Sequence, residues 1–108
     1  EAVIDKDLAG QRLATLIDAS IFVILTDVDG AYLNYGTPEQ TLIEQTTPQQ
    51  LEQYLMEGHF KEGSMSPKIT AAIRFVQNGG ERAIIAELSK LREAMQRKSG
   101  THVTRSGP

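Results

Sequence analysis

The first apolar residues of the chain are arranged as in a strand, and the next group as in a helix. Residues 2–4 form a short apolar run of strong β formers that ends at the acid-base-acid triplet 5–7. Beyond it, Leu13, Leu16 and Ile17 follow the three- and four-residue offsets of one helical face. This pattern predicts a strand, a turn and a helix.

A second strand is indicated by residues 21–25, which are apolar without alternation. Such a run is typical of a strand that is buried on both faces of a parallel sheet covered by helices. The turn-rich segment 26–30 follows it, and the aromatic segment 31–35 predicts a short strand or extended arm.

Two predicted helices begin with a capping residue next to a proline. Residues 47–50 show the capping-box pattern with proline at the first helical position, and Gly58 is the expected stop. Ser66 and Pro67 repeat this start, and the Asn-Gly-Gly sequence at 78–80 is expected to end the second helix.

The last third of the chain predicts a buried strand at 82–86, a helix at 89–98 and a final strand at 101–104. We expect Leu91, Ala94 and Met95 to face inward from that helix. Strands and helices alternate, which predicts an α/β fold with a mostly parallel sheet between helices. Residues 1–104 are expected to form one domain, and residues 105–108 a disordered tail.

Composition and charge limit the function more than they define it. The chain has 108 residues, 40% of them hydrophobic, which suits one domain with a modest core. Its formal net charge is −3, so it has no basic field to hold a nucleic acid or an anionic membrane. A small anionic ligand would have to be held by local geometry.

Residue content also bears on the compartment. The chain has no cysteine, which excludes disulfides, thiolate metal sites and a cysteine nucleophile, and fits a cytoplasmic protein. No apolar run approaches the roughly 20 residues that span a bilayer, and no signal-peptide pattern opens the sequence. The chain starts at Glu1, inside a predicted strand, so we expect it to be part of a longer soluble protein.

The first candidate for chemistry is the triplet Asp5, Lys6 and Asp7, because it follows a predicted strand. Open α/β sheets bind ligands at the carboxyl ends of their strands. Lys6 and Asp7 could therefore contribute to a binding site. Alternatively, Asp7 only caps the following helix and Lys6 is solvated, and capping aspartates are common.

The second candidate is the small-residue segment 63–68, which leads into a helix whose first turn contains Lys68. The helix dipole disfavours a cation there by roughly 0.3–1 kcal/mol, unless an anion binds at the same end. Backbone N–H groups at a helix start and one lysine can together hold a phosphate. The alternative is that Lys68 points into water.

The turn at 26–30 is similar to a calcium loop only in its aspartates. Counted from the first of them, Tyr32 occupies the position that requires glycine and Ala31 a ligand position. The turn could hold a nucleotide's sugar or base through its backbone, or simply connect two strands. His59 and His102 lack metal-ligand spacing and are predicted to be structural or exposed.

Seven ordered blocks of the sequence closely resemble carbamate kinases, across nearly the whole chain. They are residues 1–9, 24–29, 32–36, 57–60, 63–65 with 67–68, 71–76 and 100–101. Carbamate kinases belong to the amino acid kinase superfamily, in which the C-terminal lobe binds nucleotide and the N-terminal lobe binds the phosphoryl acceptor. The resemblance implies that residues 1–104 are the C-terminal lobe.

The resemblance also implies roles for individual residues. Asp7 matches the aspartate that holds catalytic lysines by charge pairing, Lys68 matches the lysine that contacts the transferring phosphoryl group, and Lys6 looks like a second lysine near the phosphates. The adenine and ribose would lie at residues 26–30, with Tyr32 and Met65. The nucleotide-binding residues implied are Thr26, Asp27, Val28, Asp29, Gly30, Tyr32, Gly63, Ser64, Met65 and Lys68.

The implied reaction is reversible phosphoryl transfer between ATP and carbamate, with ATP or ADP and Mg²⁺ as cofactors. Such enzymes commonly make ATP from ADP and carbamoyl phosphate during the degradation of arginine or related nitrogen compounds. The resemblance further implies a cytoplasmic homodimer when the protein is full length.

Three departures from the family pattern keep other functions open. Ser66 stands where the family usually has glycine, residues 61–62 replace a more apolar pair, and Thr37 replaces a lysine. The family's N-terminal half has no counterpart here, so the isolated lobe is expected to be inactive. The alternatives are a nucleotide-sensing module without catalysis and a related kinase that acts on another small acid.

Overall fold

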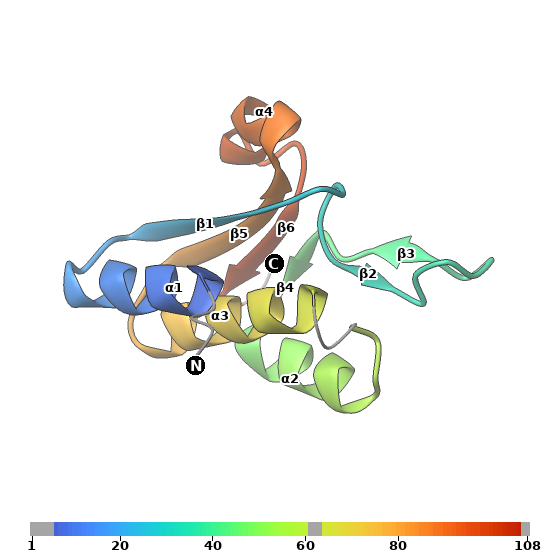
Figure 1. Cartoon of the computed structure of the whole chain (residues 1–108), viewed down its shortest axis with the longest axis horizontal. Coiled ribbons are helices and arrows are strands. Elements are labelled where there is room, and N and C mark those ends of the chain that lie inside the picture. The colour runs from blue at the N-terminus through green and yellow to red at the C-terminus, as the bar shows by residue number, and fades with distance from the viewer. Residues whose placement is uncertain (1–5, 61–63, 107–108) are drawn as a thin grey trace, which may run out of the picture.

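The computed structural model describes residues 6–60 and 64–106, which form a sheet with helices on both faces (Figure 1). The predicted strand at 2–4 lies outside the described residues. So do Gly63 and the end of the predicted tail, residues 107–108.

The main sheet is four-stranded and mostly parallel. The strands of the chain are β1 (Ile21–Thr26), β2 (Tyr32–Leu33), β3 (Thr41–Leu42), β4 (Gln45–Thr46), β5 (Arg82–Glu87) and β6 (Thr101–Thr104). The sheet order is β1-β5-β6-β4, with β1/β5 and β4/β6 parallel and β5/β6 antiparallel. β2 and β3 form a separate antiparallel arm (Figure 1). The predicted α/β fold is confirmed.

Helices cover the sheet unequally. They are α1 (Lys6–Leu16), α2 (Pro48–Met56), α3 (Met65–Gln77), the 3₁₀ turn η1 (Leu88–Lys90) and α4 (Leu91–Met95). Helices α1, α2 and α3 lie on one side of the sheet, and α4 lies on the other (Figure 1). Within the described ranges, no helix has the length and apolar character needed to cross a membrane.

Strand β5 shows why both faces of the sheet need covering. Its side chains alternate between the faces, as in any strand. Ala83 and Ile85 belong to the large core beneath α3, whereas Ile84 and Ala86 pack with Ala94 of α4 on the opposite face. The continuous apolar run therefore reflects burial on both sides, as predicted for this strand.

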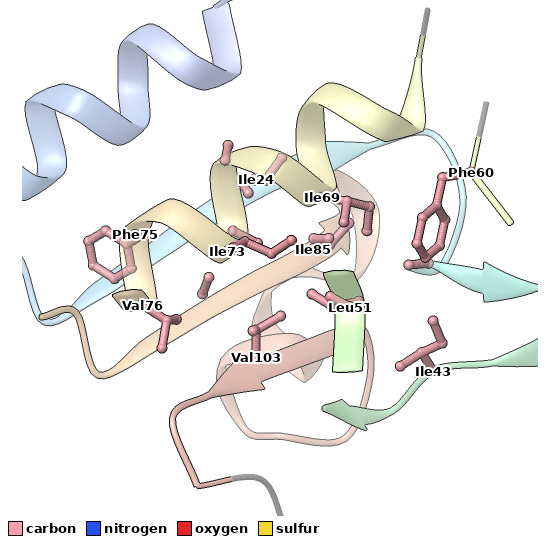
Figure 2. Packing of buried hydrophobic residues seen from close by; sticks show 14 of the residues in the cluster. Ile24, Ile43, Leu51, Phe60, Ile69, Ile73, Phe75, Val76, Ile85 and Val103 are labelled. Carbon is pink, nitrogen blue, oxygen red and sulfur yellow. The ribbon is translucent and has the colours of Figure 1, made fainter. Parts of the chain in front are cut away.

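Helix α3 supplies much of the large core. Its residues Ile69, Ala72, Ile73 and Val76 are at most 5% exposed. Figure 2 shows Ile69 and Ile73 facing Ile85 of the sheet. Full burial of such side chains contributes roughly 1.5–3 kcal/mol each, so α3 is the main tie between the helical layer and the sheet.

Helix α2 begins as predicted. Thr47 is the N-cap, and its side chain accepts a hydrogen bond from the backbone N–H of Gln50 at 3.2 Å. Pro48 occupies the first helical position, where a missing N–H costs nothing. The helix ends before Gly58, which adopts a left-handed conformation with φ of 83°.

Helix α3 begins earlier than the sequence predicts. Its N-cap is Ser64, not Ser66, and its first residue is Met65. Pro67 therefore lies inside the first turn. This is tolerated because the first four N–H groups of a helix have no intrahelical partner. A proline near a helix start consequently does not fix the first residue.

The predicted apolar face of α1 is wrong. Leu13, Leu16 and Ile17 are 60%, 81% and 67% exposed, whereas Gln11 and Ala14 are buried. The helix packs mainly against α3, and its buried positions are occupied by small or polar residues that a hydropathy pattern does not detect. Asp7 is likewise not the N-cap, because α1 already begins at Lys6.

Strand β1 is less buried than its apolar run predicts. Phe22 and Ile24 pack into the large core, but Ile21 and Leu25, on the other face, are 43% and 40% exposed. The reason is the short helix α4, which has five residues instead of the predicted ten-residue span. Of its expected inward residues, only Ala94 is buried, and Met95 is 49% exposed.

His102 is a buried polar residue that links three segments of the fold. It is 4% exposed, and its Nδ1 accepts a hydrogen bond from Nη1 of Arg82 at 3.0 Å. Its Nε2 donates to the backbone oxygen of Ser99 at 2.9 Å. This arrangement requires the neutral ring, and burial lowers the pKa of His102 below its usual 6.5.

Acidification should destabilise the protein through His102. Because its folded-state pKa is lowered, the unfolded chain binds the proton more readily, so stability is full above pH of about 6.5 and is lost as pH falls below it. We expect the free energy of unfolding in urea to fall from about pH 7.5 to about pH 5.5, by at most about 1.4 kcal/mol per pH unit. His102→Gln should flatten this slope; an unchanged slope would contradict the assignment.

Candidate functional site

A cavity of about 930 Å³ lies where the carboxyl end of β1 meets the first turns of α1 and α3. This is the sheet edge at which α/β proteins place their ligands. From α1, β1 and the turn after it, the lining residues are Lys6, Asp7, Leu25, Thr26, Asp27, Val28 and Gly30. From later segments they are Tyr32, Tyr35, Gly58, His59, Phe60, Ser64, Met65, Pro67, Lys68 and Leu88.

The ammonium group of Lys68 joins three elements at one side of this cavity. Its Nζ donates to Oδ2 of Asp7 at 2.9 Å and to the backbone oxygen of Leu25 at 3.0 Å. Lys68 comes from the first turn of α3, Asp7 from the first turn of α1 and Leu25 from β1. The side chains of Lys68 and Asp7 are each 14% exposed. The structure therefore brings together two of the three predicted catalytic residues, Asp7 and Lys68.

The electrostatics at this point favour an anion. The N-terminal turns of α1 and α3 both border the cavity at this point, and each carries partial positive charge on its backbone N–H groups. Ser64, the N-cap of α3, makes no side-chain capping bond, so its hydroxyl does not satisfy those N–H groups. The charges of the two lining carboxylates, Asp7 and Asp27, are matched by the two lysines, Lys6 and Lys68, so the N–H groups of the helix starts supply the positive excess. Phosphate oxygens have the matching charge.

Lys6 lies at the rim. Its side chain is 81% exposed, and its Nζ is 3.7 Å from Oδ1 of Asp7. This looser pairing leaves the Lys6 ammonium largely in solvent, at the edge of the cavity that its side chain lines. Lys6 is thus solvated, as the alternative interpretation of the 5–7 triplet had it, although both Lys6 and Asp7 also border the cavity.

The turn after β1 forms one wall of the cavity, but one of its residues points elsewhere. Thr26, Asp27, Val28 and Gly30 line the cavity, whereas Asp29 does not. Its Oδ1 accepts from Nζ of Lys90 at 3.0 Å, which holds the pKa of the Asp29 carboxyl below its usual value.

Tyr32 is a lining residue that touches Asp29 from the cavity side. Its hydroxyl donates to Oδ2 of Asp29 at 3.4 Å. Burial, and secondly the nearby carboxylate, raise the pKa of the Tyr32 hydroxyl, so the phenol is neutral at ordinary pH. Together with Tyr35, whose ring centroid is 5.5 Å away, it offers an aromatic surface to a planar ligand.

Among the other predicted residues, Ser64 and Met65 line the cavity, and Gly63 lies outside the described residues. Ser66 is not a lining residue. Its substitution for the usual glycine therefore does not narrow the cavity by direct contact, because α3 turns it away from the lining side. The sequence-based reason for suspecting an altered substrate is weakened.

His59 was predicted to be structural or exposed. In the structure it also lines the cavity. Its Nδ1 accepts from the backbone N–H of Asn34 at 3.3 Å, and its Nε2 lies 3.2 Å from Oε1 of Glu57. It thus connects the β2–β3 arm to the end of α2. Tyr35, Phe60 and Leu88 are further lining residues that the residue patterns did not single out.

The described residues contain no cluster of metal-binding side chains. Across residues 6–60 and 64–106, no group of three or more His, Cys, Asp or Glu side chains is arranged to hold a metal ion. The lining residues offer positively charged groups that can position a bound anion and stabilise its charge, next to an apolar and aromatic wall.

A family model and individual relatives of known sequence and structure all point to the same protein family. The model of the amino acid kinase family matches residues 1–87. The chain is 59% identical over 104 residues to a carbamate kinase of Pyrococcus horikoshii, covering 96% of this chain and 33% of the relative. It is 57% identical over 105 residues to a carbamate kinase of Thermococcus kodakarensis, covering 97% of this chain and 33% of that relative.

A solved structure shows the same fold. Carbamate kinase from Giardia lamblia bound to AMP-PNP superposes with a TM-score of 0.91 at 39% identity, covering 96% of this chain and 33% of that one. The chain thus spans about a third of the length of the curated relatives it matches.

The Asp7–Lys68 pair should show strong energetic coupling. We expect Lys68→Met and Asp7→Asn each to lower the free energy of unfolding, because each leaves the other residue shielded from water without its main partner. The free energy of unfolding of the double variant should fall by less than the sum of the two single losses. The difference is the coupling energy, and we expect roughly 1–2 kcal/mol from a double-mutant cycle measured by urea unfolding.

The exposed pair Asp29–Lys90 is the matched control. Its side chains are 40% and 48% exposed, so Asp29→Asn and Lys90→Met should couple less than the partly buried pair Asp7–Lys68. Equal coupling in both pairs would show that burial of Asp7 and Lys68 has no energetic consequence.

Proposed function

The chain belongs to the amino acid kinase family, and we propose that it forms the nucleotide-binding lobe of a carbamate kinase. In this proposal the whole enzyme transfers a phosphoryl group reversibly between ATP and carbamate. The single observation that carries it is the junction of Lys68, Asp7 and the Leu25 carbonyl beside a cavity large enough for a nucleotide. The identity to carbamate kinases over nearly all of this chain supports the choice of reaction.

Each charged residue has a role in the proposed mechanism. Lys68 contacts the oxygens of the transferring phosphoryl group, and Asp7 fixes the direction of its ammonium by the 2.9 Å bond. Lys6 adds a second, mobile positive charge near the phosphates. Charge accumulates on the equatorial oxygens in phosphoryl transfer, so fixed positive groups lower the barrier without a general base in this lobe.

The adenine and ribose would lie against the turn after β1. Thr26, Asp27, Val28 and Gly30 supply backbone groups along one wall, and Tyr32 and Met65 supply aromatic and apolar contacts. Asp29 takes part only through Tyr32 and Lys90, because it does not line the cavity. The AMP-PNP in the Giardia lamblia relative agrees with a nucleotide as ligand.

Mg²⁺ fits this site as a companion of the nucleotide. Asp7 and Asp27 both line the cavity, but the described residues offer no three-ligand cluster, and Mg²⁺ is commonly held by one or two carboxylates plus phosphate oxygens. When bound, it would neutralise phosphate charge during transfer.

The remaining features of the proposal concern the whole enzyme. Carbamate or carbamoyl phosphate would bind in a second lobe, and the direction in the cell would be ATP formation from ADP and carbamoyl phosphate in arginine breakdown. The full-length protein would be a cytoplasmic homodimer.

Loss of Lys68 should abolish most transfer while leaving the fold intact. In a coupled assay of ATP formation from ADP and carbamoyl phosphate, we expect Lys68→Ala in the full-length protein to lower kcat by about 100-fold or more. The substitution removes charge stabilisation at the phosphoryl group, so the ADP dissociation constant should change much less. Circular dichroism would check the fold.

Lys98→Ala is the control, because Lys98 is an exposed lysine that does not line the cavity. Its rate should equal that of the unaltered protein. An unchanged rate in Lys68→Ala would remove Lys68 from the mechanism. Activity toward another small acid, with none toward carbamoyl phosphate, would favour the alternative of a related kinase.

A further inference from the structure

We propose that Thr101 is a positioning residue for the nucleotide, acting through the turn after β1. Its hydroxyl would hold this turn in the shape that the adenosine part of the ligand requires. The inference rests on the proposed function, since it assumes that a nucleotide binds along this turn. Thr101 lies in β6, beyond the residues 1–87 that the family model matches, and it does not line the cavity.

The first observation is a buried hydrogen bond between distant parts of the chain. Oγ1 of Thr101 accepts from the backbone N–H of Ala31 at 2.8 Å, and both residues are fully buried. The carbonyl oxygen of Ala31 in turn accepts from the backbone N–H of Ile43 at 2.8 Å. Both backbone polar groups of Ala31 are therefore hydrogen-bonded. Its N–H binds the side chain of Thr101, and its carbonyl oxygen binds the backbone of Ile43, the residue that follows β3.

The second observation is the close approach of the turn to β6. A Cβ atom on Gly30 would lie 2.6 Å from Oγ1 of Thr101 and 3.0 Å from its backbone nitrogen. Gly30 is thus needed for space, because any larger residue would push the turn away from the hydroxyl. Gly30 and Tyr32, which flank the anchored Ala31, both line the cavity.

The third observation explains why Thr101 itself is fixed. The chain enters β6 through Gly100, which has a left-handed φ of 84°. A Cβ there would lie 2.9 Å from the backbone oxygen of Ile85 in β5. Thr101 therefore starts β6 in close contact with the central strand, and its hydroxyl is presented to Ala31 from a rigid support.

A positioning role makes a prediction that a purely structural role does not. Loss of the hydroxyl should weaken contacts to the adenosine half of the ligand, which lies against the turn. It should not weaken contacts to the polyphosphate half, which lies at Lys68 and Asp7. A structural role would lower stability alone, or weaken both halves together.

The test compares ADP and inorganic tripolyphosphate as ligands of the full-length protein by titration calorimetry. Thr101→Val keeps the shape of the side chain but cannot accept the bond from Ala31, and we expect its ADP dissociation constant to rise by about three- to tenfold. Tripolyphosphate affinity should stay unchanged. Thr101→Ser, which keeps the hydroxyl, should bind ADP like the unaltered protein.

Two further comparisons keep the test decisive. Thr46→Val removes a hydroxyl that is equally buried, at 1% exposure, but whose partners are Thr47 and Gln50, so ADP affinity should not change. If Thr101→Val does not fold, the pair Thr101→Ser and Thr101→Ala, which differ only in the hydroxyl, replaces it, with weaker ADP binding expected in the alanine variant.

The outcomes separate this inference from the proposed function. Absence of ADP binding in the unaltered protein would overturn both. Normal ADP affinity without the hydroxyl, or equal weakening of ADP and tripolyphosphate, would overturn the role of Thr101 while leaving the proposed function intact.

Discussion

The contact on which the site depends is the one between the Lys68 ammonium, the Asp7 carboxylate and the Leu25 carbonyl oxygen. A lysine in the first turn of a helix is repelled by the helix dipole, so its position must be stabilised by other groups. Here a carboxylate and a carbonyl oxygen from two other elements supply that stabilisation. One side chain therefore fixes the relative positions of α1, β1 and α3 and also places a positive charge at the mouth of the cavity.

The opposite wall of the cavity is fixed by uncharged contacts. Thr101 and Ile43 hold Ala31, and the absence of a side chain at Gly30 lets the turn lie against β6. The two walls thus differ in physical character. The wall at Lys68 and Asp7 relies on charge, which tolerates small displacements, whereas the turn relies on short-range packing and one buried hydrogen bond, which do not.

Much of this arrangement could be predicted from sequence, for identifiable reasons. The strand at 82–86 was predicted from its apolar run, and the helix that ends before residues 78–80 from its capping signals, although this helix begins two residues earlier than predicted. The closeness of Asp7 and Lys68 could be expected because strand ends and helix starts meet at one sheet edge. Thr47 was found because a capping residue and a proline give a local signal.

Apart from the start of α3, the differences share one cause, which is that burial depends on neighbours distant in sequence. Leu13, Leu16 and Ile17 have helical spacing, yet α1 turns other residues toward α3. Asp29 lies among lining residues but is directed away by Lys90, 61 positions later. The role of Thr101 is likewise invisible locally, because its partner is 70 residues away.

The net charge of −3 is compatible with a polyphosphate ligand because the field that matters is local. Charges separated by more than a Debye length, about 8–10 Å at physiological ionic strength, are largely screened when exposed to solvent. A ligand in the cavity would lie within that distance of the groups that line it, and the side chain of Lys68 is only 14% exposed. In the proposed function, a few positioned groups therefore outweigh the acidic surface, and the turn after β1 discriminates the nucleotide by shape and not by charge.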